Sequence, residues 1–240
     1  MKDLFGKAIL DYYTKNAPAP LITATSISDE DEMDVAYLFR SYDLMPKIEQ
    51  KALQLAFGKI LDVGCGAGSH GLSLQNDRNL EVTAIDVSEK AIETCKLRGL
   101  RKCLTVDILD YETDEKYDTI LLLMNGTGIF QTLEKTPIYL QKIKSLLATN
   151  GQILIDSSDL IYMFDEDDSE DSDGGKWISS NGYYGELTFT IQYKGETEIP
   201  FPWLYLDYNT LQNAAFANGL QCELISEGEH FDYLARLTHL

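Results

Sequence analysis

The chain has 240 residues, 44% of them hydrophobic, and a formal net charge of −19. This composition is enough for a globular core, and the charge argues against nucleic acid as a partner, because Lys and Arg are what bind phosphate backbones. The longest aliphatic run, residues 120–124, is far shorter than the roughly 20 residues that cross a bilayer, so no membrane association is expected. Asp3 and Asp11 argue against a secretory signal, and the 4 cysteines form no CxxC pair. Together these features predict a cytoplasmic protein without zinc or disulfides.

The first 50 residues are expected to form a helical segment. Helical spacing of apolar residues ends at Pro18 and Pro20, which break the pattern. The acidic residues 29–32 would open a second helix at its positive end, and Val35 would begin its apolar stripe. We expect residues 1–50 to serve as a lid on the rest of the chain.

From residue 59 onward, apolar strands alternate with helical segments. The expected strands are 59–63, 80–86, 102–106, 117–124 and 152–156, and the expected helices are 69–75, 88–97 and 136–147. This alternation is typical of a parallel sheet covered on both faces, so the fold class is α/β and residues 51–240 form the main domain. A helix at 207–218 and two strands at 221–226 and 231–237 close the chain. The short link between these two strands makes them antiparallel neighbours.

Residues 160–205 interrupt this rhythm and are expected to form an insert on the substrate side. Residues 165–173 are an acidic stretch, expected to be a solvated loop. Residues 187–193 alternate with period two and lead through a turn to 196–199, which predicts a β-hairpin. The exposed edge of such a hairpin could pair with another copy, so the chain is expected to be a monomer or a homodimer.

The most informative motif lies between the first strand of this series and its helix. Gly64, Gly66 and Gly68 follow Asp62 at this turn. Glycines there let a ligand approach the backbone, and the N–H groups at the start of the helix are free to meet it. A dinucleotide-binding fingerprint would place its third glycine where this chain has Ser69.

The run Asp62–Gly68 (DVGCGAG) resembles the first motif of the class I S-adenosylmethionine-dependent methyltransferases. The order of elements is similar to that family over residues 55–158 and 203–238. The resemblance implies a Rossmann-like sheet of seven strands, six parallel and one antiparallel, with an N-terminal helical lid and a β-hairpin insert. It also implies S-adenosylmethionine as the cofactor. The implied cofactor-binding residues are Asp62, Gly64, Cys65, Gly66, Gly68, Asp86, Val87, Asp107, Ile108, Met124 and Asn125.

Asp86 and Asp107 have separate implied roles. A carboxylate at the end of the second strand of this series can accept hydrogen bonds from both ribose hydroxyls, which suits Asp86. A helix cap is the alternative role for Asp86, because Ser88 and Glu89 follow it. Asp107 would lie near the adenine amine, and the side chain of Cys65 could simply fill space.

The acceptor site is less defined by the sequence. Asn125 follows the fourth strand of this series, whose end faces the substrate in this fold, and Tyr162, Trp203 and His230 are further candidates for substrate contact. Asp156 is a weaker candidate, with a polar strand end as its alternative role. No catalytic base and no metal ligand set is assigned.

Arg40 and His70 are two basic residues near the predicted site. Arg40 could reach the carboxylate of the cofactor, with a solvated helix charge as the alternative. His70 is expected to be a partly exposed helix residue.

The predicted function is transfer of a methyl group from S-adenosylmethionine to a small molecule. A protein or RNA acceptor, a non-catalytic S-adenosylmethionine-binding module and an NAD-dependent oxidoreductase remain as alternatives.

Overall fold

The computed structural model describes residues 2–164 and 182–240, so the acidic stretch 165–173 lies outside the described residues. Seven strands form the larger of two sheets, in the order β11-β12-β7-β6-β3-β4-β5. Their bounds are β3 (Lys59–Val63), β4 (Glu81–Asp86), β5 (Lys102–Thr105), β6 (Tyr117–Leu122), β7 (Leu147–Ser158), β11 (Leu220–Glu227) and β12 (Asp232–His239).

The pairing within this sheet confirms the predicted arrangement of six parallel strands and one antiparallel strand. Strands β5, β4, β3, β6 and β7 pair in parallel. Strand β12 runs antiparallel to both β7 and β11, so β11 points the same way as the other five. The short connection from β11 to β12 permits this hairpin, whereas each parallel pair needs a longer crossover.

Helices cover both faces of the larger sheet. On one face lie α2 (Lys47–Leu55), α3 (Ser69–Asp77) and α4 (Glu89–Leu97), and on the other lie α5 (Thr136–Leu146) and α6 (Tyr208–Ala217). Because alternate residues of a strand point to opposite faces, Ile120 and Leu122 pack with α5 and α6, whereas Leu121 packs with α2, α3 and α4. All three side chains are fully buried, as expected for a strand with helices on both sides.

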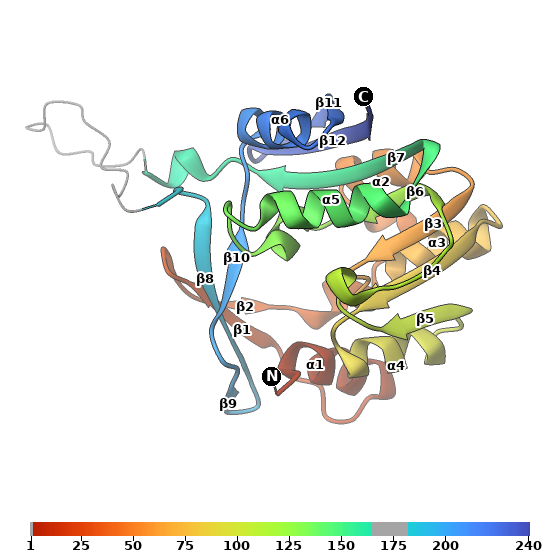
Figure 1. Cartoon of the computed structure of the whole chain (residues 1–240). Helices are drawn as coiled ribbons and strands as arrows, with labels where there is room; N and C mark the ends of the chain where they lie inside the picture. The colour runs from red at the N-terminus through yellow and green to blue at the C-terminus, as the bar shows by residue number, and fades with distance from the viewer. Residues whose placement is uncertain (1, 165–181) are drawn as a thin grey trace, which may run out of the picture.

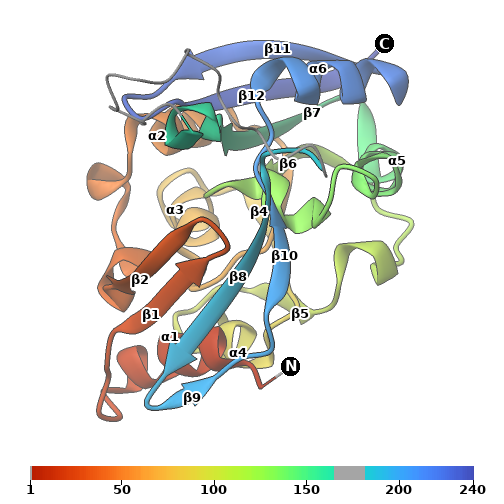
Figure 2. The ribbon, with the colours of Figure 1, turned by 90° about the vertical axis from the view of Figure 1, so that its left-hand side faces the viewer.

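A second, antiparallel sheet lies across the carboxyl ends of the larger one. It consists of β1 (Leu21–Thr25), β2 (Ser28–Met33), β8 (Glu186–Tyr193), β9 (Glu196–Thr197) and β10 (Phe201–Leu204), and is called the covering sheet below. Figure 1 shows the central parallel strands of the larger sheet, such as β3 and β7, pointing towards β8 and β10, and Figure 2 shows the covering sheet from its outer side. The N-terminal hairpin and the insert therefore build one structure.

The predicted second helix over residues 29–32 is wrong. These residues form the edge strand β2, and two 3₁₀ segments, η1 (Val35–Phe39) and η2 (Tyr42–Leu44), lie between it and α2. The acidic side chains are exposed, which suits an edge strand because charge discourages pairing with another chain. Pairing of β1 with β8, a contact distant in sequence, decides the local structure here.

The predicted hairpin in the insert is confirmed by the pairing of β8 with β9. Strand β8 of this hairpin pairs with β1 along one side and with β9 and β10 along the other. The outer strands of the covering sheet are therefore β2 and β10, of which β10 belongs to the insert, and pairing of the insert with another copy stays a prediction.

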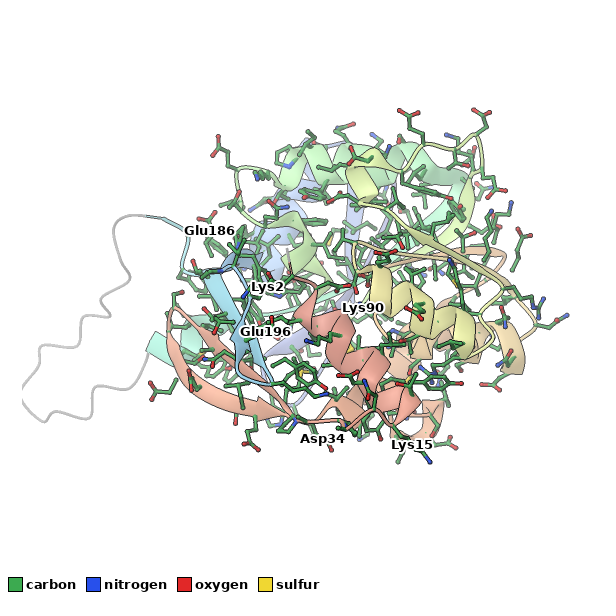
Figure 3. The ribbon with its side chains drawn as sticks, turned by 90° about the horizontal axis from the view of Figure 1, so that it is seen from below. Lys2, Lys15, Asp34, Lys90, Glu186 and Glu196 are labelled. Atoms are coloured by element: carbon green, nitrogen blue, oxygen red, sulfur yellow. The ribbon has the colours of Figure 1, made fainter. Side chains whose placement is uncertain are left out.

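The first helix, α1 (Leu4–Thr14), confirms the prediction of a helix before Pro18. It packs against α4 and the covering sheet, where Leu4 and Ile9 share one buried cluster with Ala67 of the glycine turn and Tyr193 of β8. Figure 3 shows α1 beside α4, with Lys2 near its start. Within residues 2–164 and 182–240, every helix is too short or too polar to span a bilayer.

Candidate functional site

The glycine turn after β3 is held against the end of β4. The N–H groups of Gly64 and Cys65 both donate to the carbonyl of Ile85, at 2.9 and 3.1 Å. Gly66 has φ +52°, a conformation that disfavours other residues, and a Cβ placed on it would meet no atom within 4 Å. The turn therefore presents bare backbone to open space, as a ligand that contacts the backbone closely requires.

Asp86 lies at the end of β4, beside this turn. One of its carboxylate oxygens accepts the N–H of Gly66 at 2.9 Å and the other accepts the N–H of Ser88 at 2.8 Å. Each oxygen keeps a further lone pair, so the carboxylate can still accept two hydroxyl groups. The cap of α4 is Ser88, whose hydroxyl accepts the N–H of Ala91 at 3.0 Å, so Asp86 is not the helix cap.

Burial raises the pKa of Asp86, and the N–H groups of Ser88 and Gly66 offset part of that rise. Burial likewise raises the pKa of Asp62, which is 2% exposed and lies on β3 under the turn. Its Oδ2 has no hydrogen-bond partner. Two acidic groups thus lie in or beside the turn, and both retain unused acceptor capacity.

Cys65 contributes its backbone to the turn and its side chain to the core. The thiol is buried, 3.8 Å from the Sγ of Cys95 on α4, which fits the space-filling role that the sequence left open.

The other predicted cofactor residues lie along the carboxyl ends of neighbouring strands. Val87 is exposed, Ile108 is buried in the core, and Asp107 caps a 3₁₀ turn (η3, Ile108–Asp110) by accepting the N–H of Leu109 at 2.9 Å. Met124 and Asn125 both have positive φ angles, +67° and +58°, in the turn after β6. These positions share the sheet edge that carries the glycine turn.

A buried network of charges lies between this edge and α2. The carboxylate of Glu49, in the first turn of α2, pairs with Arg40 and lies 2.6 Å from Nε2 of His70 on α3. All three residues are less than 10% exposed. The interpretations of Arg40 as a solvated charge and of His70 as a partly exposed residue are therefore wrong, because the two side chains meet at one buried carboxylate.

The pKa shifts within this network follow from its contacts. Burial by itself would raise the pKa of Glu49, but His70 and Arg40 outweigh it and hold the pKa below its usual value. Burial would lower the pKa of His70, but Glu49 and Asp62 outweigh it and raise the pKa. The folded protein therefore favours a charged pair of Glu49 and His70.

A cavity of about 570 Å³ lies between the larger sheet and the covering sheet, and is called the central cavity below. It is lined by Thr25, Ser28, Tyr37, Pro46, Ile48, Glu49, Met124, Asn125, Asp156, Ser157, Ser158, Leu160, Tyr162, Met163, Leu187, Tyr205, His230 and Asp232. Three of the four predicted substrate residues, Asn125, Tyr162 and His230, belong to this lining. The fourth, Trp203, does not, because its ring packs against the backbone at Gly128.

Asp156 joins the cavity to the turn after β6. Its two oxygens accept the N–H groups of Met124 and Gly126, each at 3.0 Å. Burial raises its pKa to about 7, with the N–H of Gly126 opposing the shift. The carboxyl is 4% exposed, so this strand end is a buried titratable group in the cavity wall. Among residues 2–164 and 182–240, no three His, Cys, Asp or Glu residues are grouped in a way that would hold a metal ion.

Comparisons with known proteins agree with this geometry. Residues 57–199 match a family model described as a methyltransferase domain. An S-adenosylmethionine-dependent methyltransferase from Bacteroides fragilis, solved with S-adenosylhomocysteine, is 45% identical with a TM-score of 0.90, over 99% of this chain and 95% of that one. The CcbJ methyltransferase from Streptomyces caelestis shares the fold at 14% identity, with a TM-score of 0.60 over 82% of this chain and 94% of that one.

A ubiquinone biosynthesis O-methyltransferase from Dechloromonas aromatica is 33% identical over 89 residues, which are 36% of this chain and 37% of that protein. The seven-stranded sheet, the glycine turn with its flanking carboxylates and the match over residues 57–199 lead to one assignment. The chain belongs to the methyltransferase domain family and is an S-adenosylmethionine-dependent methyltransferase.

Proposed function

We propose that the backbone of Gly64–Gly68 and the carboxylate of Asp86 hold S-adenosylmethionine, and that the central cavity holds a small-molecule acceptor. The observation that carries the cofactor site is the combination of open space at Gly66 with free acceptor capacity on Asp86. The cofactor supplies a methyl group on a positively charged sulfur. The ribose hydroxyls would donate to Asp86. The rest of the cofactor would be surrounded by Asp62, Asp107, Met124 and Asn125.

The residues of this chain would then contribute mainly by placing the acceptor and excluding water. The covering sheet, together with α1, is proposed to act as the lid over both ligands. Support comes from the lining of the central cavity, which includes Thr25 and Leu187 of the covering sheet as well as Asp156 of β7 and Asn125 in the turn after β6. A volume of about 570 Å³ lies within the range typical of small-molecule sites.

The alternatives predict different behaviour. A protein or RNA acceptor would need a site open enough for a chain, and RNA would also need basic contacts. The lining residues that the structure describes include no Lys or Arg. A non-catalytic module would bind S-adenosylmethionine without turnover in any acceptor screen.

The direct test is substitution of Asp86. Asp86→Ala should weaken binding of S-adenosylhomocysteine at least about tenfold, since hydrogen bonds to a charged group contribute roughly 1.5–3 kcal/mol each. Calorimetric titration measures the effect. Asp114→Ala is the matched control, because Asp114 lies in a surface hollow at the opposite end of the sheet. Unchanged affinity in a folded Asp86→Ala protein would refute the proposed site.

A further inference from the structure

The lining of the central cavity is acidic. Glu49, Asp156 and Asp232 contribute carboxylates, and among the described lining residues His230 is the one basic side chain. The charge of Glu49 is balanced by Arg40 and His70. In the part of the chain that the structure describes, no Lys or Arg forms an ion pair with Asp156 or Asp232. The field in the cavity therefore favours a cationic guest over a neutral or anionic one.

The same cavity is rich in aromatic side chains. Tyr37, Tyr162 and Tyr205 belong to its lining, and Tyr162 stacks on Phe231 with ring centroids 4.8 Å apart. The faces of aromatic rings attract cations, ammonium and methylated ammonium groups among them. One face of Tyr37 already holds the guanidinium of Arg40 at 4.0 Å, so one of these three rings binds a cation within the molecule itself.

We propose that the methyl acceptor is an organic amine, bound in the central cavity as a cation between the carboxylates of Asp156 and Asp232 and the tyrosine rings. This inference rests on the proposed function, because it assigns the chemical class of the acceptor for that same site. Carboxylates and tyrosine rings bind the ammonium form of the substrate and of the methylated product alike.

The proton balance of the reaction agrees with an amine. An ammonium acceptor first gives a proton to the carboxylate of Asp156. The freed nitrogen lone pair then forms the bond to the methyl carbon, while the carbon–sulfur bond breaks and its electron pair stays on sulfur. The product is a methylated ammonium ion, and Asp156 later returns its proton to solvent.

The pKa of Asp156, about 7, makes it a suitable proton acceptor for an amine. An alkylammonium group loses its proton near pH ~10.4, whereas a hydroxyl comparable to water does so near ~15.7. The equilibrium constant for proton transfer to Asp156 is therefore about five powers of ten larger for an ammonium group than for an aliphatic hydroxyl. The titratable groups around Asp156 are Glu49, His70, Tyr37, Tyr205, His230 and Asp232.

Two isosteric probes separate charge from shape: choline and its neutral carbon analogue 3,3-dimethylbutan-1-ol. Calorimetry with the whole protein saturated with S-adenosylhomocysteine should show choline binding at least about tenfold more tightly than the neutral analogue, since cation–π contacts and a carboxylate both favour the charge. Binding of S-adenosylhomocysteine itself is measured first. Its failure would count against the proposed function, whereas equal binding of the two probes, or binding of neither, would overturn only the inference about the acceptor.

Variants locate the binding. Asp232→Asn and Tyr205→Leu should each reduce the preference for choline at least about threefold while leaving the affinity for S-adenosylhomocysteine unchanged. Asp156→Asn should also reduce the preference for choline, but Asp156 holds the turn at Met124–Gly126 beside the proposed cofactor site, so the affinity for S-adenosylhomocysteine is judged on the other two variants. Asp114→Asn removes one negative charge at the opposite end of the sheet and should change nothing. A choline preference that survives Asp232→Asn and Tyr205→Leu would overturn the proposal.

Discussion

At the scale of single residues, Gly66 is a position where a side chain would affect both the backbone conformation and the proposed ligand. Its φ of +52° is in the left-handed region, and the space in front of it is open. A methyl group there would therefore cost backbone strain and would also fill the space proposed for the cofactor. These two effects can be separated by comparison with a glycine in a similar conformation elsewhere.

Gly66→Ala should reduce the affinity for S-adenosylhomocysteine at least about tenfold, by blocking close approach to the backbone. Gly195→Ala is the control, because Gly195 has φ +78° and equally open space in the turn between β8 and β9. Both variants should lose about 1–2 kcal/mol of unfolding free energy from the left-handed conformation. Calorimetry and urea unfolding measure the two quantities, and similar affinity in both variants would contradict the placement of the ligand.

The buried pair of His70 and Glu49 predicts a dependence of stability on pH. The pKa of His70 is raised above 6.5, so its stabilisation is complete below that pH and is lost as pH rises through the folded pKa. The pKa of Glu49 is lowered below 4.5, so its stabilisation is present above that pH. The pair therefore stabilises the fold most between these two values.

His70→Gln should lower the free energy of unfolding by about 1–3 kcal/mol near pH ~5.5, and by less near pH ~8.5. Urea denaturation of the wild type and the variant at the two pH values gives the difference. A deficit that is larger at the higher pH would show that the charged pair is not the source of the stabilisation.

At the scale of elements, α1 is fixed by a carboxylate from the far end of the chain. Glu198 follows β9, is 5% exposed, and accepts the N–H groups of Lys2 at 2.8 Å and Leu4 at 3.3 Å. A negative charge at the N-terminus of a helix also favours its dipole. Glu196, two residues earlier and labelled in Figure 3, makes only an exposed ion pair with Lys7 at 2.9 Å.

Glu198→Ala should lower stability by about 1–3 kcal/mol and raise amide hydrogen exchange in α1, because two N–H groups lose their acceptor. Glu196→Ala should cost less stability than Glu198→Ala and leave α1 protected, as expected for a surface ion pair. Hydrogen exchange followed by mass spectrometry compares the two variants. Equal protection of α1 in both would mean that Glu198 does not hold the helix.

The sequence predicted the elements of the larger sheet well and the covering sheet poorly, for a physical reason. Strands such as β6 are continuous apolar runs, and the order of strands and helices restricts their arrangement to few topologies. Strand β1 is stabilised by β8, which lies far away in sequence, and no local pattern reports such a pairing. The local pattern of residues 29–32 therefore predicts a helix, whereas the pairing of β1 places them at a sheet edge.

The candidate site likewise contains residues that the sequence predicts and residues that it does not. The glycine turn and Asp86 end two successive strands of a recognisable series, so the sequence predicts them, whereas Glu49 and His70 lie 21 residues apart on different helices. The signal that could have found them is chemical: a Glu and a His each in the first turn of a helix beside the same sheet edge. Their contact depends on how α2 packs against α3, and no local sequence pattern predicts that packing.

At the scale of the whole molecule, ligand binding should stabilise the fold. S-adenosylhomocysteine at about 100 times its dissociation constant should add roughly 2.7 kcal/mol, which corresponds to a rise in melting temperature of about 5–10 °C for a chain of this size. NAD at the same concentration should leave the melting temperature unchanged. Differential scanning fluorimetry provides both curves, and a shift with NAD alone would favour the oxidoreductase alternative.

The division of the covering sheet between two distant segments has a consequence during synthesis. Strand β1 ends at Thr25 and its partner β8 begins at Glu186, so a ribosome needs on the order of 10 s to produce the chain between them. In that interval the hairpin of β1 and β2 lacks its partner strand β8. During that interval, the exposed acidic side chains of β2 would disfavour pairing of this hairpin with a wrong strand. The covering sheet over the central cavity would therefore be among the last parts of the molecule to form.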